Sequence, residues 1–112
     1  MLHKNFGVKG YNDMLKNLGT KQLYLTAGNP WGYTSSRSAA LVWQEIYKYK
    51  DETKNGEFLF NIVTNAANNY MEQGMDHYES AHKSGSTQKE HHDAGIVFAK
   101  DDYIVVSLNN NN

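Results

Sequence analysis

Residues 82–86 read His-Lys-Ser-Gly-Ser, residues 92–97 read His-Asp-Ala-Gly-Ile-Val, and residues 103–106 read Tyr-Ile-Val-Val. Apolar residues in this C-terminal third occur in short runs separated by polar turns, a pattern typical of strands. Lys-Asp-Asp at residues 100–102 fits a tight turn, which predicts a hairpin. Because the Ile-Val-Val run is continuous, we expect the last strand to be covered on both faces. We predict strands over residues 77–83, 94–99 and 103–108, with a polar connection over residues 84–92.

Upstream of these strands, apolar residues recur with a helical period. A short amphipathic helix is predicted from Tyr11, Met14, Leu15 and Leu18, which stand at i, i+3, i+4 and i+7. Gly19 then fits a left-handed C-cap. Residues 23–33 are predicted to form a loop, because four of them are Gly28, Asn29, Pro30 and Gly32.

Two further helices are predicted before the strands. Ser35 or Ser36 fits the N-cap of the first, and its apolar face comprises Ala39, Val42, Trp43, Ile46 and Tyr47. The polar residues 50–56 end it. The apolar face of the next helix comprises Phe58, Leu59, Ile62, Val63 and Ala66, and Asn68 and Asn69 end that helix. Gly74 is predicted to break the chain again.

Helices followed by a three-stranded antiparallel sheet make an α+β fold. We expect one domain over residues 1–112, with the helical part at about 8–70 and the sheet part at about 76–108.

Composition excludes several classes of function. A net charge of −1 and a pI near 6.5 give no electrostatic case for a nucleic-acid partner. The chain has no cysteine, so no disulfide, zinc–thiolate site or thiol nucleophile is available. The first five residues, Met-Leu-His-Lys-Asn, lack the apolar region of a signal peptide, and no apolar run reaches membrane-spanning length.

Taken in order, these segments resemble the C-terminal portion of the class A β-lactamase and penicillin-binding D,D-peptidase superfamily of serine hydrolases. In that family a Lys-Ser/Thr-Gly triplet lies on the strand at the edge of the active site, and residues 83–85 match it. A second strand begins near an Asp-x-Gly, as at residues 93–95, and a hairpin leads to an apolar third strand. Residues 18–19 (Leu-Gly) resemble the turn after an earlier helix, and residues 34–40 resemble the helix start after the omega loop.

The resemblance implies a role for each residue of the first motif. Lys83 and Ser84 are expected to hold the substrate carboxylate, and Gly85 to let the strand edge approach the substrate. The backbone N–H of Ser86 is expected to be one donor of the oxyanion hole. The ligand implied is a β-lactam or a small molecule like a peptidoglycan peptide, with no cofactor and no metal. Members of the family are usually exported.

The resemblance also implies a nucleophile that we do not find. In the family it lies in a Ser-x-x-Lys turn at a helix start, with a Ser-Asn-type loop elsewhere. Ser80 and Lys83 have this spacing, but residues three apart in a strand point to opposite faces. Residues 28–32 hold no acid to match the omega-loop glutamate of class A enzymes. We therefore predict no catalytic residue in this chain and no activity of the chain alone.

A partial domain of this kind is expected to expose an apolar face, because the family's N-terminal strands and C-terminal helix would cover the sheet. We expect either self-association or pairing with a missing N-terminal segment. The alternative hypothesis is a non-catalytic binding or assembly module derived from the fold.

Three other groups of residues suggest chemistry. His77, His82, His91 and His92 invite a metal site, although adjacent histidines usually point apart. A triad of Ser86, His91 and Asp93 is conceivable, but nothing in the spacing requires it. Trp31 and Tyr33 flank a glycine and suit ligand stacking, although such residues more often pack a loop onto the core.

Overall fold

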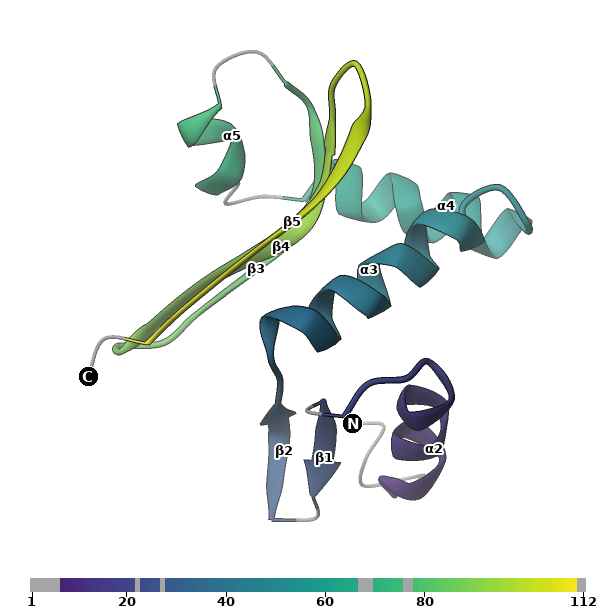
Figure 1. The fold of residues 1–112 in the computed structure, drawn as a ribbon, viewed down its shortest axis with the longest axis vertical. Coiled ribbons are helices and arrows are strands. Elements are labelled where there is room, and N and C mark those ends of the chain that lie inside the picture. The colour runs from purple at the N-terminus through teal and green to yellow at the C-terminus, as the bar shows by residue number, and fades with distance from the viewer. Residues whose placement is uncertain (1–6, 22, 27, 67–69, 76–77, 111–112) are drawn as a thin grey trace.

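The computed structural model describes residues 7–21, 23–26, 28–66, 70–75 and 78–110. Its elements are α2 (Lys9–Asn17), β1 (Tyr24–Thr26), β2 (Asn29–Tyr33), α3 (Ser36–Tyr49), α4 (Lys54–Thr64), α5 (Tyr70–Gly74), β3 (Ser80–Ser86), β4 (Glu90–Phe98) and β5 (Asp102–Asn110). Strands β3, β4 and β5 form an antiparallel sheet in that spatial order. Figure 1 shows α5 on one side of this sheet and α3 on the other. The α+β prediction is confirmed.

β4 and β5 are longer than predicted, whereas β3 has the predicted length but begins three residues later, at Ser80. β3 and β4 pair from Ser80 opposite Val97 to Ser86 opposite His91, so the polar connection predicted over residues 84–92 is wrong. The connection comprises only residues 87–89. The hydroxyl of Thr87 supports this turn by accepting hydrogen bonds from the backbone N–H groups of Lys89 and Glu90. Polar side chains do not prevent a ladder, because the ladder is made by backbone groups.

Side-chain caps set the starts of α3 and α4. Ser35 caps α3 by accepting a hydrogen bond from the N–H of Ser38 at 3.2 Å, as predicted. Thr53 caps α4 in the same way, through the N–H of Gly56 at 2.9 Å. The third predicted helix therefore starts earlier than its apolar pattern indicated. Gly56 is required here, because a Cβ atom would lie 1.8 Å from the carbonyl oxygen of Tyr49.

Residues 23–33 contain a hairpin, so the predicted loop is wrong. β1 and β2 pair antiparallel, with Tyr24 opposite Tyr33. The two tyrosine rings stack with their centroids 5.0 Å apart, although both rings are about half exposed. Tyr33 thus contacts Tyr24 instead of packing a loop onto the core. Cross-strand aromatic pairs of this kind stabilise short hairpins.

Other helix predictions had mixed outcomes. Gly19 has a φ of +82°, the left-handed conformation expected of a C-cap. Of the predicted stripe on α2, Leu15 is buried, whereas Tyr11 and Met14 are exposed. Helix α5 was not predicted, although it ends at the expected break, Gly74. Asn68, Asn69 and His77 lie outside the described residues.

The core lies between α3, α4 and one face of the sheet. Trp43, Ala94 and Ile96 form its centre, and the partly buried residues packed against them are Ile46, Tyr47, Phe60, Val63, Phe98 and Val106. The predicted apolar face of α3 is therefore confirmed at Trp43, Ile46 and Tyr47. This packing fixes the sheet on the helical layer.

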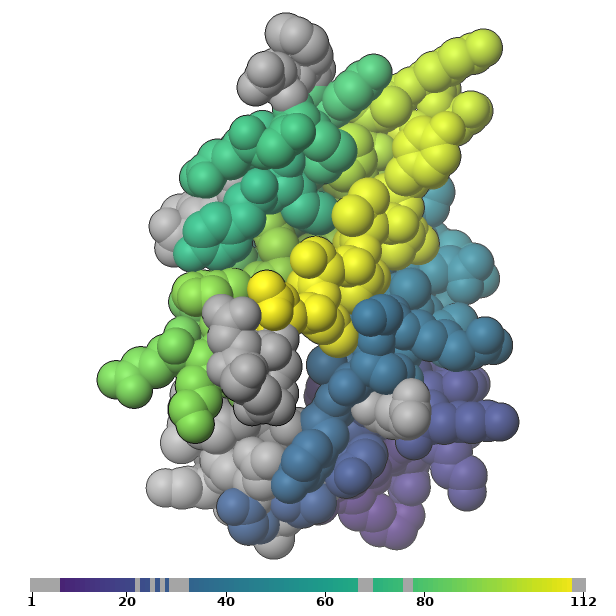
Figure 2. Space-filling model, turned by 60° about the vertical axis from the view of Figure 1, so that its left-hand side comes forward, coloured from purple at the N-terminus to yellow at the C-terminus, as the bar shows by residue number. Residues whose placement is uncertain are grey.

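Several large apolar side chains remain exposed. Ile104 on β5 is 38% exposed, so the expectation that both faces of the last strand are covered is wrong within this chain. Three residues of the predicted apolar face of α4 are also exposed, namely Phe58, Leu59 and Ile62. Figure 2 shows the yellow atoms of β5 at the surface, between the blue atoms of α3 and the green atoms near α5. None of the helices in the described part of the chain is long and apolar enough to cross a lipid bilayer.

Candidate functional site

The predicted motif lies on β3, which is one edge of the three-stranded sheet. Along the strand, burial decreases from Ser80, Ala81 and His82, which are buried, to Lys83, Gly85 and Ser86, which are exposed. The motif residues therefore lie on an accessible strand, as the predicted roles require. They occupy neither a helix nor a closed core.

The hydrogen-bond pattern of the ladder shows which backbone groups of β3 point outward. The carbonyl of Glu79 accepts from the N–H of Phe98, and the N–H of Thr87 donates to the carbonyl of Glu90. These two bonds place the backbone groups of odd-numbered residues toward β4. Because the direction alternates along a strand, Ser84 and Ser86 direct their N–H and C=O groups away from β4. The N–H of Ser86 thus points to the outer edge of the sheet.

The ammonium of Lys83 reaches this same outer edge. It donates a hydrogen bond to the carbonyl oxygen of Ser84, which points away from β4. A cation, a hydroxyl-bearing residue and an outward N–H therefore follow one another within four residues of one edge. That combination suits an anionic ligand lying alongside β3.

Two Ser-x-x-Lys spacings occur in β3 and the turn after it, and neither forms a nucleophile site. Ser80 is 1% exposed, and its hydroxyl lies 3.0 Å from an Oε1 of Glu72 on α5, whereas Lys83 is exposed. The sequence prediction that these two residues point apart agrees with this arrangement. A second such spacing, from Ser86 to Lys89, runs into the β3–β4 turn, where no helix begins.

The possible triad of Ser86, His91 and Asp93 does not form. Asp93 is 3% exposed and points into the molecule, whereas His91 is exposed at the surface of β4. The Oδ1 atom of Asp93 lies 3.1 Å from Nδ1 of His82 instead. Asp93, which the sequence suggested as a partner of His91, therefore pairs with His82.

The three described histidines of the group suggested as a metal site, His82, His91 and His92, do not gather around a common point. His92 accepts a hydrogen bond at Nδ1 from the N–H of Asn109, and His82 is enclosed next to Asp93. Among the residues that the structure describes, no group of three or more His, Asp or Glu side chains is placed to hold a metal ion.

The pair of His82 and Asp93 was missed as a unit from the sequence. His82 is fully buried and stands directly opposite Gly95 in the ladder. A Cβ atom on Gly95 would lie 2.7 Å from Cα of His82, so the glycine makes room for the close approach of the two strands. A glycine in register with a large polar residue was the signal that could have revealed this buried pair.

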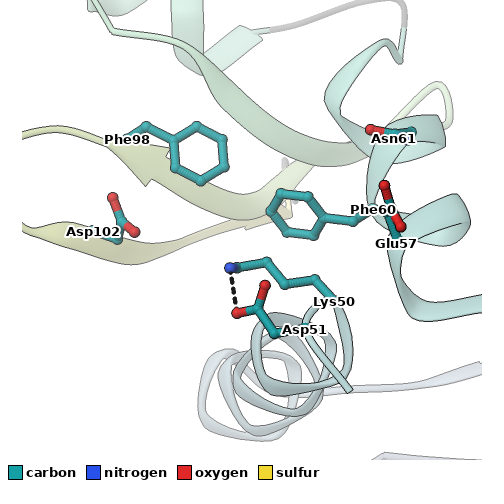
Figure 3. A pocket seen from close by; sticks show the side chains of 7 residues that line it. All are labelled: Lys50, Asp51, Glu57, Phe60, Asn61, Phe98 and Asp102. Carbon is teal, nitrogen blue, oxygen red and sulfur yellow. Dashed lines mark hydrogen bonds and ion pairs between the residues drawn. The ribbon is translucent and has the colours of Figure 1, made fainter. Parts of the chain in front are cut away.

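A separate hollow has a volume of about 400 Å³, and Figure 3 shows the side chains that line it. It lies at the end of the sheet where β4 meets β5, whereas Ser86 lies at the end where β3 meets β4. Its walls come from the end of α3, from α4 and from the β4–β5 turn, and the lining residues are Lys50, Asp51, Glu57, Phe60, Asn61, Phe98 and Asp102. Its charged groups are partly paired, because Lys50 bonds Asp51 at 2.6 Å. This hydrogen bond raises the pKa of Lys50.

The phenol of Tyr47 borders this hollow through its bond to Asp102. The hydroxyl donates to Oδ2 of Asp102 at 2.7 Å, and this hydrogen bond raises the pKa of Tyr47. The ammonium of Lys50 also lies 4.8 Å from the centroid of the Tyr47 ring. These contacts link α3 to the β4–β5 turn and are remote from the motif.

A family model described as the β-lactamase enzyme family matches residues 1–112. The comparison with curated protein sequences gave no match.

Solved structures share the fold. The β-lactamase from Sphaerobacter thermophilus DSM 20745 aligns with a TM-score of 0.76 and 17% identity, covering 98% of this chain and 47% of that chain. PBP-A aligns with a TM-score of 0.74 and 18% identity, covering 92% and 42%. An acyl-enzyme complex of a PBP-A mutant with penicillin G aligns with a TM-score of 0.72 and 18% identity, covering 88% and 41%. The chain thus spans less than half the length of each of these structures.

Proposed function

This chain belongs to the β-lactamase enzyme family, and from that membership we propose that it is the C-terminal part of a serine hydrolase acting on β-lactam or D-Ala-D-Ala-type amides. The observation that carries the proposal is the outer edge of β3. There the ammonium of Lys83 bonds the outward carbonyl oxygen of Ser84, and the N–H of Ser86 also points outward. Both are donors suited to an anionic substrate whose reacting carbonyl lies nearby.

In this proposal the substrate lies alongside β3. Its carboxylate accepts hydrogen bonds from the ammonium of Lys83 and the hydroxyl of Ser84. As a nucleophile adds to the carbonyl carbon, the carbonyl oxygen gains negative charge and accepts a hydrogen bond from the N–H of Ser86. This bond strengthens as the charge develops, so it stabilises the transition state more than the bound substrate.

The nucleophile belongs, in this proposal, to a segment outside these residues. Ser80 is buried and bonded to Glu72, and the strand directs it away from the face that carries Lys83. The site of substrate binding and the site of covalent attack therefore come from different parts of the full catalytic unit. The chain alone is expected to bind substrate without forming an acyl-enzyme.

Binding is tested by titrating the isotopically labelled chain with penicillin G and following backbone amide shifts. We expect the amides of residues 84–86 to shift. Lys83→Ala is expected to weaken binding by about tenfold or more, because a hydrogen bond to a charged group contributes about 1.5–3 kcal/mol. Lys89→Ala is the matched control, since Lys89 is an exposed lysine in the adjacent turn. Equal effects of the two variants would contradict the role of Lys83.

Covalent labelling tests the origin of the nucleophile. The chain alone is incubated with a fluorescent penicillin and examined after denaturation. No label is expected to remain on the wild-type chain. Stable labelling that disappears in Ser86→Ala would show that this chain supplies its own nucleophile, and would overturn that part of the proposal.

A second candidate function, assembly without catalysis, is favoured by the exposed apolar side chains of α4. Phe58 is 67% exposed and Ile62 is 53% exposed, one helical turn apart. Apolar patches on a surface often mark partner contacts. Sedimentation of the wild-type chain and of a Phe58→Ser, Ile62→Ser variant tests this function. A wild-type chain that stays monomeric at high concentration contradicts self-assembly.

A further inference from the structure

The buried side chain of His82 lies between two hydrogen-bond acceptors. Its Nδ1 atom is 3.1 Å from Oδ1 of Asp93, and its Nε2 atom is 3.3 Å from the carbonyl oxygen of Ala66. The other carboxylate oxygen of Asp93 accepts a hydrogen bond from the N–H of Met71 at 3.2 Å. His82 has no exposed surface and Asp93 is 3% exposed, so water does not replace these partners.

Counting donors and acceptors determines how many protons this arrangement needs. A backbone carbonyl and an ionised carboxylate only accept hydrogen bonds, and a neutral imidazole has a single N–H. Beside an ionised Asp93, a neutral ring would therefore direct a nitrogen lone pair at an oxygen, which is unfavourable in a buried site. Both contacts are satisfied when His82 donates from both ring nitrogens to Ala66 and an ionised Asp93.

These bonds connect four segments around the back of β3. His82 belongs to β3, Asp93 to β4, Ala66 follows α4, and Met71 belongs to α5. The close fit of Gly95 against the backbone of His82 holds β4 tightly to the same point of β3. The next residue along β3 is Lys83, whose side chain points to the opposite face. Any movement of the strand at His82 is thus transmitted directly to Lys83.

We propose that His82 is a positioning residue for Lys83 and Ser84, acting through the buried hydrogen bonds that join its ring to Asp93 and to Ala66, and that in the wild-type chain His82 and Asp93 form an ion pair. This inference rests on the proposed substrate role of Lys83. His82 has no exposed surface, so in this proposal it acts on the motif through the strand and does not contact the substrate. Its contribution is to fix the position and direction of β3 relative to β4 and α5, so that the Lys83 ammonium and the Ser86 N–H keep their distance from each other.

The protonation part is tested in the ligand-free chain by nitrogen-15 NMR of the imidazole ring at neutral pH. The wild-type chain is expected to show two protonated, solvent-protected nitrogens on His82. Asp93→Asn is the matched variant, because its amide donates to Nδ1 and its oxygen still accepts from Met71. That variant is expected to keep the fold and to show one protonated ring nitrogen. A single protonated nitrogen in the wild-type chain would overturn the ion pair.

The positioning part is tested by the affinity for penicillin G. Asp93→Ala is expected to weaken binding between about 10-fold and 100-fold, since small displacements of a binding group have effects of this size. Asp93→Asn is expected to restore affinity to within about twofold of wild type, because it can keep the three hydrogen bonds. Equal affinity of folded Asp93→Ala and wild-type chains would overturn positioning.

A second variant covers the case in which Asp93→Ala does not fold. His82→Phe combined with Asp93→Leu removes the ion pair and keeps an apolar, packed interior, which proteins often tolerate. Reduced affinity of this folded variant supports positioning, and unchanged affinity overturns it. Failure of the proposed function has a different signature, because Lys83→Ala would then have no effect on penicillin binding in the wild-type background.

Discussion

The two faces of the β3–β4 pair are held by different forces. On the face toward α3, Ala94 and Ile96 pack against Trp43 in an apolar cluster. On the face toward α5, His82 and Asp93 meet through directed hydrogen bonds, and Ser80 is bonded to Glu72. Apolar packing fixes the distance between layers but tolerates small adjustments, whereas a buried polar network has one satisfied arrangement.

The positions of side chains are therefore defined most strictly on the polar face. The polar face lies behind the strand that carries Lys83, and the apolar face anchors the sheet on the helices. We expect the loss of the buried His82–Asp93 pair on the polar face to destabilise the fold most. Substitutions on the polar face should also affect the motif more than substitutions of similar size on the apolar face.

The largest effect is expected for His82→Ala. Removing the imidazole leaves the carboxylate of Asp93 buried with one partner lost, and breaking a buried charge pair typically costs about 3–5 kcal/mol. Urea unfolding measures this loss. His91→Ala is the control, because His91 is exposed on the neighbouring strand and should change stability by less than about 0.5 kcal/mol. Similar losses of unfolding free energy in both variants would show that the buried pair does not stabilise the polar face.

A smaller effect is expected for Gly95→Ala. The new methyl group would lie 2.1 Å from the carbonyl oxygen of Ala81, so β3 and β4 must separate. Overpacking of this kind costs about 1–3 kcal/mol.

Gly85→Ala is its control, since a Cβ at Gly85 meets nothing within 4 Å. It should leave the unfolding midpoint unchanged while weakening penicillin binding at the strand edge. An unfolding midpoint that falls equally in both variants would show that the crowding at Gly95 is not what limits β3.

On the apolar face, Ile96→Val is expected to cost only about 0.5–1.5 kcal/mol. Ile96 has no exposed surface, and the variant removes one methylene from the cluster around Trp43. Chemical denaturation and the amide spectrum of residues 83–86 both report on it. We expect the spectrum of the motif to stay unchanged. A loss larger than that of His82→Ala would reverse the comparison.

The smallest effect concerns Tyr47, at the border of the apolar face. Its hydrogen bond to Asp102 raises the pKa of Tyr47 above the ordinary value of 10.0. Because the folded-state pKa is raised, the bond contributes fully at lower pH and is lost as pH rises through the raised value. Asp102→Asn should therefore lower the midpoint of the Tyr47 absorbance titration, with Asp101→Asn as the control. An unchanged midpoint would contradict this contact.

The sheet and the amphipathic helices could be predicted because their signals are local. Short apolar runs and a three-residue turn indicated the β4–β5 hairpin, and Ser35 indicated the start of α3. The β1–β2 hairpin was missed because glycine and Pro30 suggest a loop, while its stability comes from a contact between two tyrosines across the strands. Helix α5 was missed because five residues carry little periodic pattern.

The candidate site was predicted only in part, for a similar reason. The motif at residues 83–86 is contiguous, so the resemblance to a family could identify it. The partnership of His82 with Asp93 depends on strand register, and a shift of one residue would place Asp93 on the other face. From the sequence, His82 was considered for a metal site and Asp93 for a triad, because the register of the two strands could not be predicted.

The central position of β4 has a consequence for how the molecule opens. β4 is paired along its length with β3 on one side and β5 on the other. Its amides can therefore exchange with solvent only after a neighbouring strand has separated, so they should be among the slowest to exchange. The segment Asp-Ala-Gly at residues 93–95 lies within β4. Partial unfolding that releases only one outer strand would thus leave β4, which carries the partner of His82, paired with the other outer strand.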